Sequence, residues 1–190
     1  MLTLDAGGDA VRARSILHTL RRKHTVATFF LTGRWVREYP GFAKRIGRRY
    51  LVANHTYNHL HMTSLSDSAV RHEIRRAEGA IRRRTGHDPR PLFRFPYGDS
   101  DARVIRIANR LGYISIRWTV DSLGWMGRAQ TVDGAVRRVV GGLRPGAIIL
   151  MHVGSPGDSR TTIDTWALPR VIDAVRRHGY RFTTLERYRR

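Results

Sequence analysis

Short apolar or β-branched runs alternate with segments of helical periodicity about seven times along this chain. Val26–Leu31 is a continuous run of the kind that is buried on both faces of a parallel sheet. Such alternation predicts an α/β fold in which helices cover parallel strands. The expected strands are Leu2–Leu4, Val26–Leu31, Leu51–Ala53, Leu92–Phe95, Tyr113–Val120 and Ala147–His152.

Helical periodicity and capping residues mark the segments between the strands. Ser66 or Asp67 can cap a helix that Gly86 ends, and Pro40 should interrupt the helix that contains it. The chain has no linker, repeat or low-complexity tract, so we expect residues 1–190 to form a single domain. The expected helices are Ala10–Lys23, Arg34–Arg49, Ser68–Arg84, Ala102–Leu111, Thr131–Leu143 and Ile163–His178.

The first expected strand begins directly after Met1 and is short for a core strand. We therefore expect that an upstream segment with an export signal is missing from this sequence. The chain itself shows no charged-then-apolar leader and no apolar run of the roughly 18 residues that span a bilayer. Export would place the protein outside the cell or at the cell wall.

The formal net charge is +20, and all of the 35 basic residues except Lys23 and Lys44 are Arg. Such a charge attracts polyanions such as nucleic acid, anionic lipid or an acidic wall polymer. The Arg residues are spread along the chain, which also fits ordinary solvated helix faces. Aromatic residues are not interleaved with them as a stacking platform for nucleic acid requires. We expect a monomer with weak polyanion affinity and no specific nucleic-acid binding.

Two imidazoles, His55 and His59, stand four residues apart after a short strand. On a helical turn this spacing places both rings on one face, where they can share a divalent cation. Cysteine is absent, so His and carboxylate are the available ligands. The acidic, glycine-rich stretch Asp5–Asp9 can supply a third ligand and a general base. His61 fits no motif and is interpreted as a surface or packing residue.

The candidate reactive residues all lie at or just after the end of a strand. In a parallel β/α barrel these strand ends converge on one face, where active sites form. The shared position therefore predicts that the residues belong to one site. They are Asp5, His55, Arg94, Asp121 and His152.

Five motifs resemble, in order, those of the polysaccharide deacetylases, carbohydrate esterase family 4 (the NodB-homology domain). The family's Thr-Phe-Asp-Asp-Gly is here Thr3–Gly7, and its His-Thr-x-x-His is matched within His55–His59. Its Arg-x-Pro-Tyr-Gly is matched by Arg94–Gly98. Its Asp-x-x-Asp-Trp resembles Asp121–Trp125, and its Leu-x-His is matched within Leu150–His152. The resemblance covers nearly the whole chain and implies a deformed (β/α) barrel.

The resemblance also implies a reaction, the metal-dependent removal of acetyl groups from a polysaccharide that contains N-acetylglucosamine. The bond cleaved is an amide but not a peptide bond. A divalent metal, Zn²⁺ first and Co, Mn or Ni as alternatives, would polarise the acetyl carbonyl and activate water. We favour peptidoglycan over chitin because an Arg-rich surface suits an anionic wall. The alternatives are an O-acetyl xylan esterase and a catalytically weak domain that binds cell-wall glycan.

The family motifs imply a role for each residue that matches them. Asp5 would take a proton from the attacking water, and Arg94 would keep that carboxylate ionised. His152 would donate a proton to the departing amine, and Asp121 would tune His152 by hydrogen bonding. The backbone N–H of Tyr97 would help to hold the oxyanion. The metal ligands would include His55 and His59, and the acetyl pocket would be walled by Tyr97, Trp125 and Leu150.

Two positions depart from the family pattern. Ala6 stands where the family has a metal-ligating acid, and its methyl group cannot bind a metal. We expect Asp9 to substitute as the third ligand; the alternatives are Asp5 as the ligand, or a two-His site completed by water. Gly124 stands where the fourth motif has its second acid. With Gly124 at this position, either Asp121 alone tunes His152 or the tuning is lost.

Overall fold

The computed structural model describes residues 1–154 and 162–188. The chain divides into two compact units. Unit 1 comprises Met1–Thr28 with Trp118–Thr184, and unit 2 comprises Phe29–Arg117 with Leu185–Arg190. Strands and helices alternate along the described residues, as the sequence predicts.

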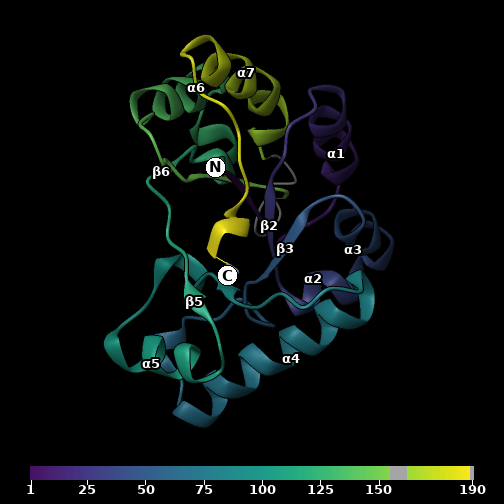
Figure 1. Ribbon diagram of the computed structural model, residues 1–190, viewed down its shortest axis with the longest axis vertical. Helices are drawn as coiled ribbons and strands as arrows, with labels where there is room; N and C mark the ends of the chain where they lie inside the picture. Colours follow the sequence, from purple (N-terminus) through teal and green to yellow (C-terminus); the bar gives the residue numbers. More distant parts are fainter. Residues whose placement is uncertain (155–161, 189–190) are drawn as a thin grey trace. The chain divides into compact units, whose positions relative to one another are not determined.

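The described residues of unit 1 form the strands β1, β7 and β6 in that order, and both strand pairs are parallel. The strands are β1 (Leu2–Ala6), β6 (Val120–Asp121) and β7 (Ile149–His152). Its helices are α1 (Ala13–Arg22), the 3-10 helix η3 (Gly124–Ala129), α6 (Val132–Gly141) and α7 (Asp164–Arg177). Helices α6 and α7 lie side by side (Figure 1). Leu4, Met151 and Leu168 are fully buried in its core.

Unit 2 holds the strand run β5-β4-β3-β2. The strands are β2 (Thr28–Leu31), β3 (Leu51–Asn54), β4 (Leu92–Phe93) and β5 (Ile114–Ser115). The α-helices are α2 (Gly33–Glu38), α3 (Pro40–Gly47), α4 (Asp67–Thr85) and α5 (Ala102–Arg110). The 3-10 helices are η1 (Met62–Ser64), η2 (Pro96–Gly98) and η5 (Leu185–Tyr188). Val70, Ile74, Phe93 and Val104 form a buried cluster within this unit.

Helix boundaries follow the capping chemistry of the sequence. The Ser66 hydroxyl accepts a hydrogen bond from the Ala69 N–H at 3.3 Å, and α4 ends at left-handed Gly86 (φ 79°). Pro40 separates α2 from α3, because it cannot donate the hydrogen bond that a continuous helix needs. None of the described helices is both long enough and apolar enough to cross a membrane.

The prediction of one strand over Tyr113–Val120 is wrong. The structure has two short strands in that segment, β5 and β6. Strand β5 pairs with β4 in unit 2, whereas β6 pairs with β7 in unit 1. The four residues between them therefore leave one partner strand for another. Apolar periodicity does not record that change of partner.

Candidate active site

Asp5 and His152 are register partners on the adjacent parallel strands β1 and β7 of unit 1. The Val153 N–H donates to the Asp5 carbonyl oxygen at 2.9 Å, which holds the two strand ends together. Asp5 is buried, and the His152 side chain is 19% exposed. A carboxylate and an imidazole therefore stand next to each other at the carboxyl ends of these strands, as the sequence positions predict.

Three carboxylates in the described part of unit 1 raise the pKa of His152. Burial lowers the pKa of His152, but the carboxylate of Asp164, 3.5 Å from Nδ1, raises it, as do the charges of Asp5 and Asp121. The net result is a His152 pKa above its ordinary value. The ring therefore keeps its proton to higher pH, which suits a general acid.

Asp164 is the residue of this group that sequence reasoning missed. It is the first residue of α7 and is fully buried. Its Oδ1 accepts from the Ser122 hydroxyl at 2.7 Å, and its Oδ2 accepts from the His152 backbone N–H at 2.8 Å. In sequence it resembles any acid at a helix start, so no pattern pointed to it.

The carboxylate of Asp121 is held by the loop that follows β6. Its Oδ1 accepts from the Leu123 N–H at 2.8 Å, and its Oδ2 accepts from Trp125 Nε1 at 3.4 Å. Burial raises the pKa of Asp121. Among the described residues these hydrogen bonds go to the loop, and Asp121 acts on His152 through its charge. Trp125 is 40% exposed, whereas Leu150 is 2% exposed and belongs to the core.

In unit 2, His55 and His59 lie on a loop after β3. The expectation of a helical turn is wrong, because Thr56 (φ 64°) and His59 (φ 62°) are left-handed. The loop nevertheless brings the two Nε2 atoms to 3.1 Å from each other, with the rings edge-on. The predicted His pair is therefore formed by a different backbone.

The His pair fits a divalent cation. Nδ1 of His55 lies 2.8 Å from the carbonyl oxygen of Arg94, so an Nδ1–H that donates there leaves the Nε2 lone pair for a metal. Two nitrogens on one tetrahedral zinc would lie about 3.3 Å apart, close to the separation here. Among the described residues, no group of three or more His, Cys, Asp or Glu is arranged to hold a metal ion. The third ligand stays a prediction.

The positions that bear on the third ligand lie in unit 1. Ala6 is buried at the end of β1. Asp9 is partly exposed, and its Oδ1 accepts from the Val11 N–H at 2.8 Å, which forms a local turn.

Glu73 supports the His loop and was also missed by sequence reasoning. Its buried carboxylate accepts the backbone N–H groups of Tyr57 (3.1 Å) and Asn58 (2.7 Å), and the side-chain amide of Asn58. Glu73 lies on the inward face of α4 with Val70 and Ile74. A single acid on an apolar helix face was the signal that could have found it.

Arg94 and Tyr97 lie near the His pair within unit 2. Arg94 is buried; its Nε donates to the Ile116 carbonyl at 3.2 Å, and its guanidinium lies 4.0 Å from the Phe30 ring centroid. Tyr97 is left-handed (φ 58°) and 61% exposed, and it meets the His59 ring edge-on. His61 stacks on Tyr97 with ring centroids 4.1 Å apart, which fits its interpretation as a packing residue.

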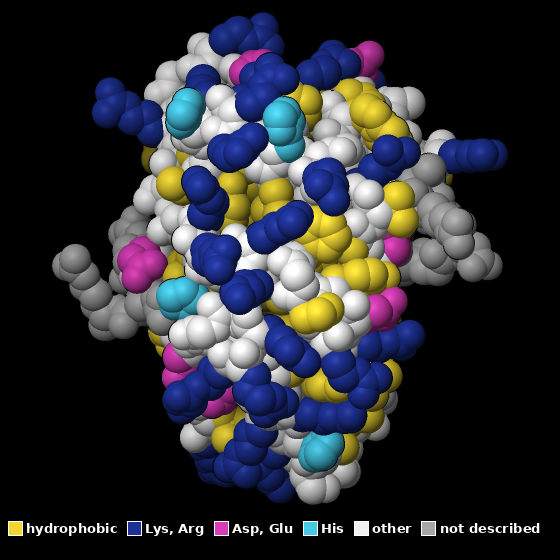
Figure 2. Space-filling model, turned by 90° about the vertical axis from the view of Figure 1, so that its right-hand side faces the viewer, with side chains coloured by type: hydrophobic (Ala, Val, Ile, Leu, Met, Phe, Trp, Pro, Cys, Tyr) yellow, Lys and Arg dark blue, Asp and Glu magenta, His cyan; other side chains and the backbone are white. Residues whose placement is uncertain are grey.

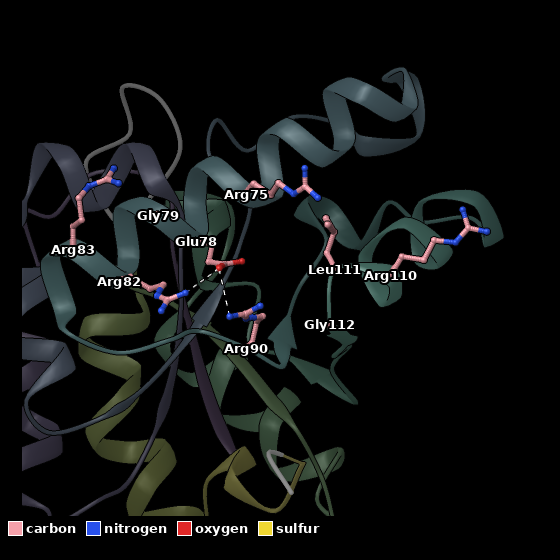
Figure 3. A pocket seen from close by; sticks show the side chains of 9 residues that line it. All are labelled: Arg75, Glu78, Gly79, Arg82, Arg83, Arg90, Arg110, Leu111 and Gly112. Atoms are coloured by element: carbon pink, nitrogen blue, oxygen red, sulfur yellow. Dashed lines mark hydrogen bonds and ion pairs between the residues drawn. The ribbon is translucent and has the colours of Figure 1, made fainter.

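A separate cavity of about 800 Å³ lies on the outward side of α4 (Figure 3). Figure 3 shows Glu78 facing Arg82 and Arg90, with ion-pair distances of 3.4 and 3.7 Å. The charged residues that line the cavity are Arg75, Glu78, Arg82, Arg83, Arg90 and Arg110. Figure 2 shows that Lys and Arg side chains are scattered over the whole visible face. Positive charge is therefore spread over this surface, and the cavity is one place where Arg side chains are concentrated.

A family model described as polysaccharide deacetylase matches residues 1–116. The chain is 31% identical over 185 residues to a peptidoglycan-N-acetylglucosamine deacetylase of Bacillus cereus, covering 97% of this chain. A solved peptidoglycan N-acetylglucosamine deacetylase superposes with a TM-score of 0.89 at 30% identity, over 98% of this chain and 85% of that one. This likeness confirms the deformed (β/α) barrel with parallel strands and helices.

A relative of a different kind is also similar to this chain. A carbohydrate esterase family 4 pseudoenzyme from Bacillus anthracis superposes with a TM-score of 0.87 at 33% identity, over 98% of this chain. The chain spans 63% of the length of that protein and 66% of the length of the Bacillus cereus relative. Deacetylases and a pseudoenzyme thus share this fold.

Proposed function

Because the chain belongs to the polysaccharide deacetylase family, we propose that it removes acetyl groups from a polysaccharide that contains N-acetylglucosamine. The register of Asp5 with His152 carries the proposal. It places a proton acceptor beside a histidine whose pKa is raised, which is the pair that amide hydrolysis needs. Relatives named as peptidoglycan deacetylases support peptidoglycan as the substrate. The protein would then act outside the cell or at the wall.

The proposed reaction is the hydrolysis of an acetamide. The Asp5 carboxylate accepts a proton as water adds to the acetyl carbon. His152 gives a proton to the amide nitrogen as the C–N bond breaks, so that acetate and a free amine leave. His55 and His59 would hold a divalent metal, with Asp9 as the third ligand. When bound, a metal such as Zn²⁺, or Co, Mn or Ni, supplies a Lewis acid for the acetyl carbonyl.

Two other functions are alternatives to the deacetylase. The same acid and base would cleave an O-acetyl ester, so an O-acetyl xylan esterase needs no further residue. Ala6 removes a ligating acid, and the chain resembles a pseudoenzyme as well as deacetylases. Both facts favour a catalytically weak domain that binds cell-wall glycan.

Acetate release separates these functions. We expect the purified, metal-loaded protein to release acetate from peptidoglycan faster than from N-acetylchitooligosaccharides, and from both faster than from acetylated xylan. Acetate is measured enzymatically, beside a pull-down with cell walls. Fastest release from xylan would favour the esterase. Binding to walls with no acetate from any substrate would replace the deacetylase by the glycan-binding domain.

The Arg-lined cavity is the place where we expect an anionic chain of the wall to bind. The charged residues that line the cavity are five Arg and one Glu. The Glu, Glu78, already pairs with Arg82 and Arg90. The exposed Arg75, Arg83 and Arg110 therefore have no carboxylate of their own in the lining. Their guanidinium groups can pair with phosphates or carboxylates of a polymer.

A charge-matched comparison tests this cavity. We expect the triple variant Arg75→Gln/Arg83→Gln/Arg110→Gln to bind an acidic wall polymer more weakly, with a shallower dependence on salt. The control is Arg14→Gln/Arg21→Gln/Arg22→Gln on α1, which removes the same charge from exposed positions of unit 1. Equal losses in the two variants would show that net charge alone attracts the polymer. Binding is measured by sedimentation at several salt concentrations.

A further inference from the structure

The fourth motif has Gly124 where the family carries its second acid, yet that position is not empty space. A Cβ built on Gly124 would collide with the carboxylate of Asp164. The carboxylate therefore occupies the volume that a side chain at position 124 would enter. It reaches this volume from α7, across a large separation in sequence.

We propose that Asp164 supplies the carboxylate that the fourth motif lacks at Gly124, and that it positions His152 for proton donation. The role of His152 as the acid rests on the deacetylase function proposed above. The placement of the carboxylate rests on geometry alone. Asp164 acts through His152 and is a positioning residue.

Asp164 contacts His152 at two points. Its Oδ2 accepts the backbone N–H of His152 at 2.8 Å and lies 3.5 Å from Nδ1 of the same residue. That Nδ1 is buried and has no hydrogen bond within the usual limits in the described part of the chain. A protonated ring thus directs its Nδ1–H at Asp164, which leaves Nε2–H for the departing amine. The arrangement follows the general logic of a carboxylate that orients a catalytic imidazole.

The carboxylate is fixed in place by its surroundings. The Ser122 hydroxyl donates to Oδ1, and the position at the N-terminus of α7 favours negative charge. The Gly124 carbonyl accepts from the Ile163 N–H at 3.1 Å and from the Thr162 hydroxyl at 3.3 Å. The loop that carries Gly124 and the helix start that carries Asp164 are therefore tied together by hydrogen bonds.

Asp121 does not make the same contacts with His152 as Asp164 does. Asp121 and Asp5 both act on its charge. However, the hydrogen bonds of Asp121 go to Leu123 and Trp125, and Asp5 is the proposed general base. Asp164, by contrast, accepts the backbone N–H of His152 at 2.8 Å and lies 3.5 Å from Nδ1 of its ring.

Asp164→Asn tests the proposal, since asparagine keeps the shape and removes the charge. We expect the His152 pKa, followed by NMR of the imidazole, to fall. The acid must be protonated, so the alkaline limb of kcat moves to lower pH, and kcat falls several-fold there with KM unchanged. Asp173→Asn is the matched control on α7, because Asp173 pairs with Lys23 at the surface. A folded Asp164→Asn protein whose His152 pKa equals that of the wild type would overturn the assignment.

Two further variants keep the test decisive if asparagine prevents folding. Gly124→Ala should push the carboxylate away and lower the His152 pKa while Asp164 is still present. Gly124→Asp/Asp164→Ala should return an acid to the motif and restore the pKa that Asp164→Ala loses. A double variant with a His152 pKa as low as in Asp164→Ala would contradict the proposal.

The NMR measurement needs no substrate, which separates this proposal from the proposed function. If the His152 pKa falls in Asp164→Asn but the wild-type protein releases no acetate from any polymer, the deacetylase function is refuted and the positioning role is retained. If the wild-type protein releases acetate but the His152 pKa is the same in Asp164→Asn, the deacetylase function is retained and the positioning role is refuted.

Discussion

His152→Asn is expected to lower kcat for acetate release from N-acetylated glycan by about 10²–10⁴-fold, the usual contribution of a general acid. Asparagine cannot deliver a proton to the nitrogen as the C–N bond breaks, and an unprotonated amine leaves poorly. His152 stands beside Asp5 in the sheet register and carries a raised pKa, so it is the group suited to this step. The variant keeps a polar side chain of moderate size.

The leaving group provides a sharper readout than the rate alone. An aryl acetate whose phenolate leaves without protonation should lose much less activity in His152→Asn than the glycan does. His178→Asn is the matched control, because His178 is exposed at the end of α7 and bonds to the Ala174 carbonyl. Equal losses on the two substrates would mean that His152 shapes the site and is not the acid.

His55→Ala is expected to weaken metal binding by more than about 100-fold, beyond the effect of losing a supporting residue around a site. The two Nε2 atoms are 3.1 Å apart, and the Arg94 carbonyl fixes the ring of His55, so one lost imidazole breaks the chelate. Competition with a chromogenic chelator measures affinity, and elemental analysis measures stoichiometry. His61→Ala is the control, since His61 stacks on Tyr97 in the same unit. If His55→Ala retains its metal with wild-type affinity, the His55/His59 pair is not the metal site.

The same series addresses the third ligand. We expect Asp9→Ala to lower the affinity for metal more than Asp5→Ala does, and Ala6→Asp to raise it by supplying the acid that the first motif lacks. The reverse order for Asp9 and Asp5 would assign ligation to Asp5 and leave the general base to be found. Wild-type affinity in both alanine variants would favour a two-His site completed by water.

Features encoded by neighbouring residues were predictable from the sequence. Ser66 and Gly86 bound α4, Pro40 separates two helices, and Asp5 and His152 end adjacent strands. These depend on local backbone rules or on strand order in a parallel sheet. The His pair was predictable in its chemistry but not in its backbone. Thr56 and His59 adopt left-handed conformations that their residue types do not signal.

The partners of the site residues were not predictable, because they depend on contacts between distant segments. Glu73 reaches the His loop from the middle of α4. Ser122 and Asp164 are 42 residues apart in the sequence and meet only in the folded unit. The sequence showed that Gly124 lacks a carboxylate. It contained no local sign that another element would fill the same volume.

The collision between a side chain at position 124 and Asp164 also constrains how this chain can evolve. Gly124→Asp, the one-step return to the family pattern, meets a carboxylate that is already in place. Asp164→Ala alone removes that carboxylate and supplies no other. The two positions thus form an epistatic pair, in which the benefit of either change depends on the other. A double-mutant cycle over positions 124 and 164 is therefore expected to show non-additive effects on the His152 pKa.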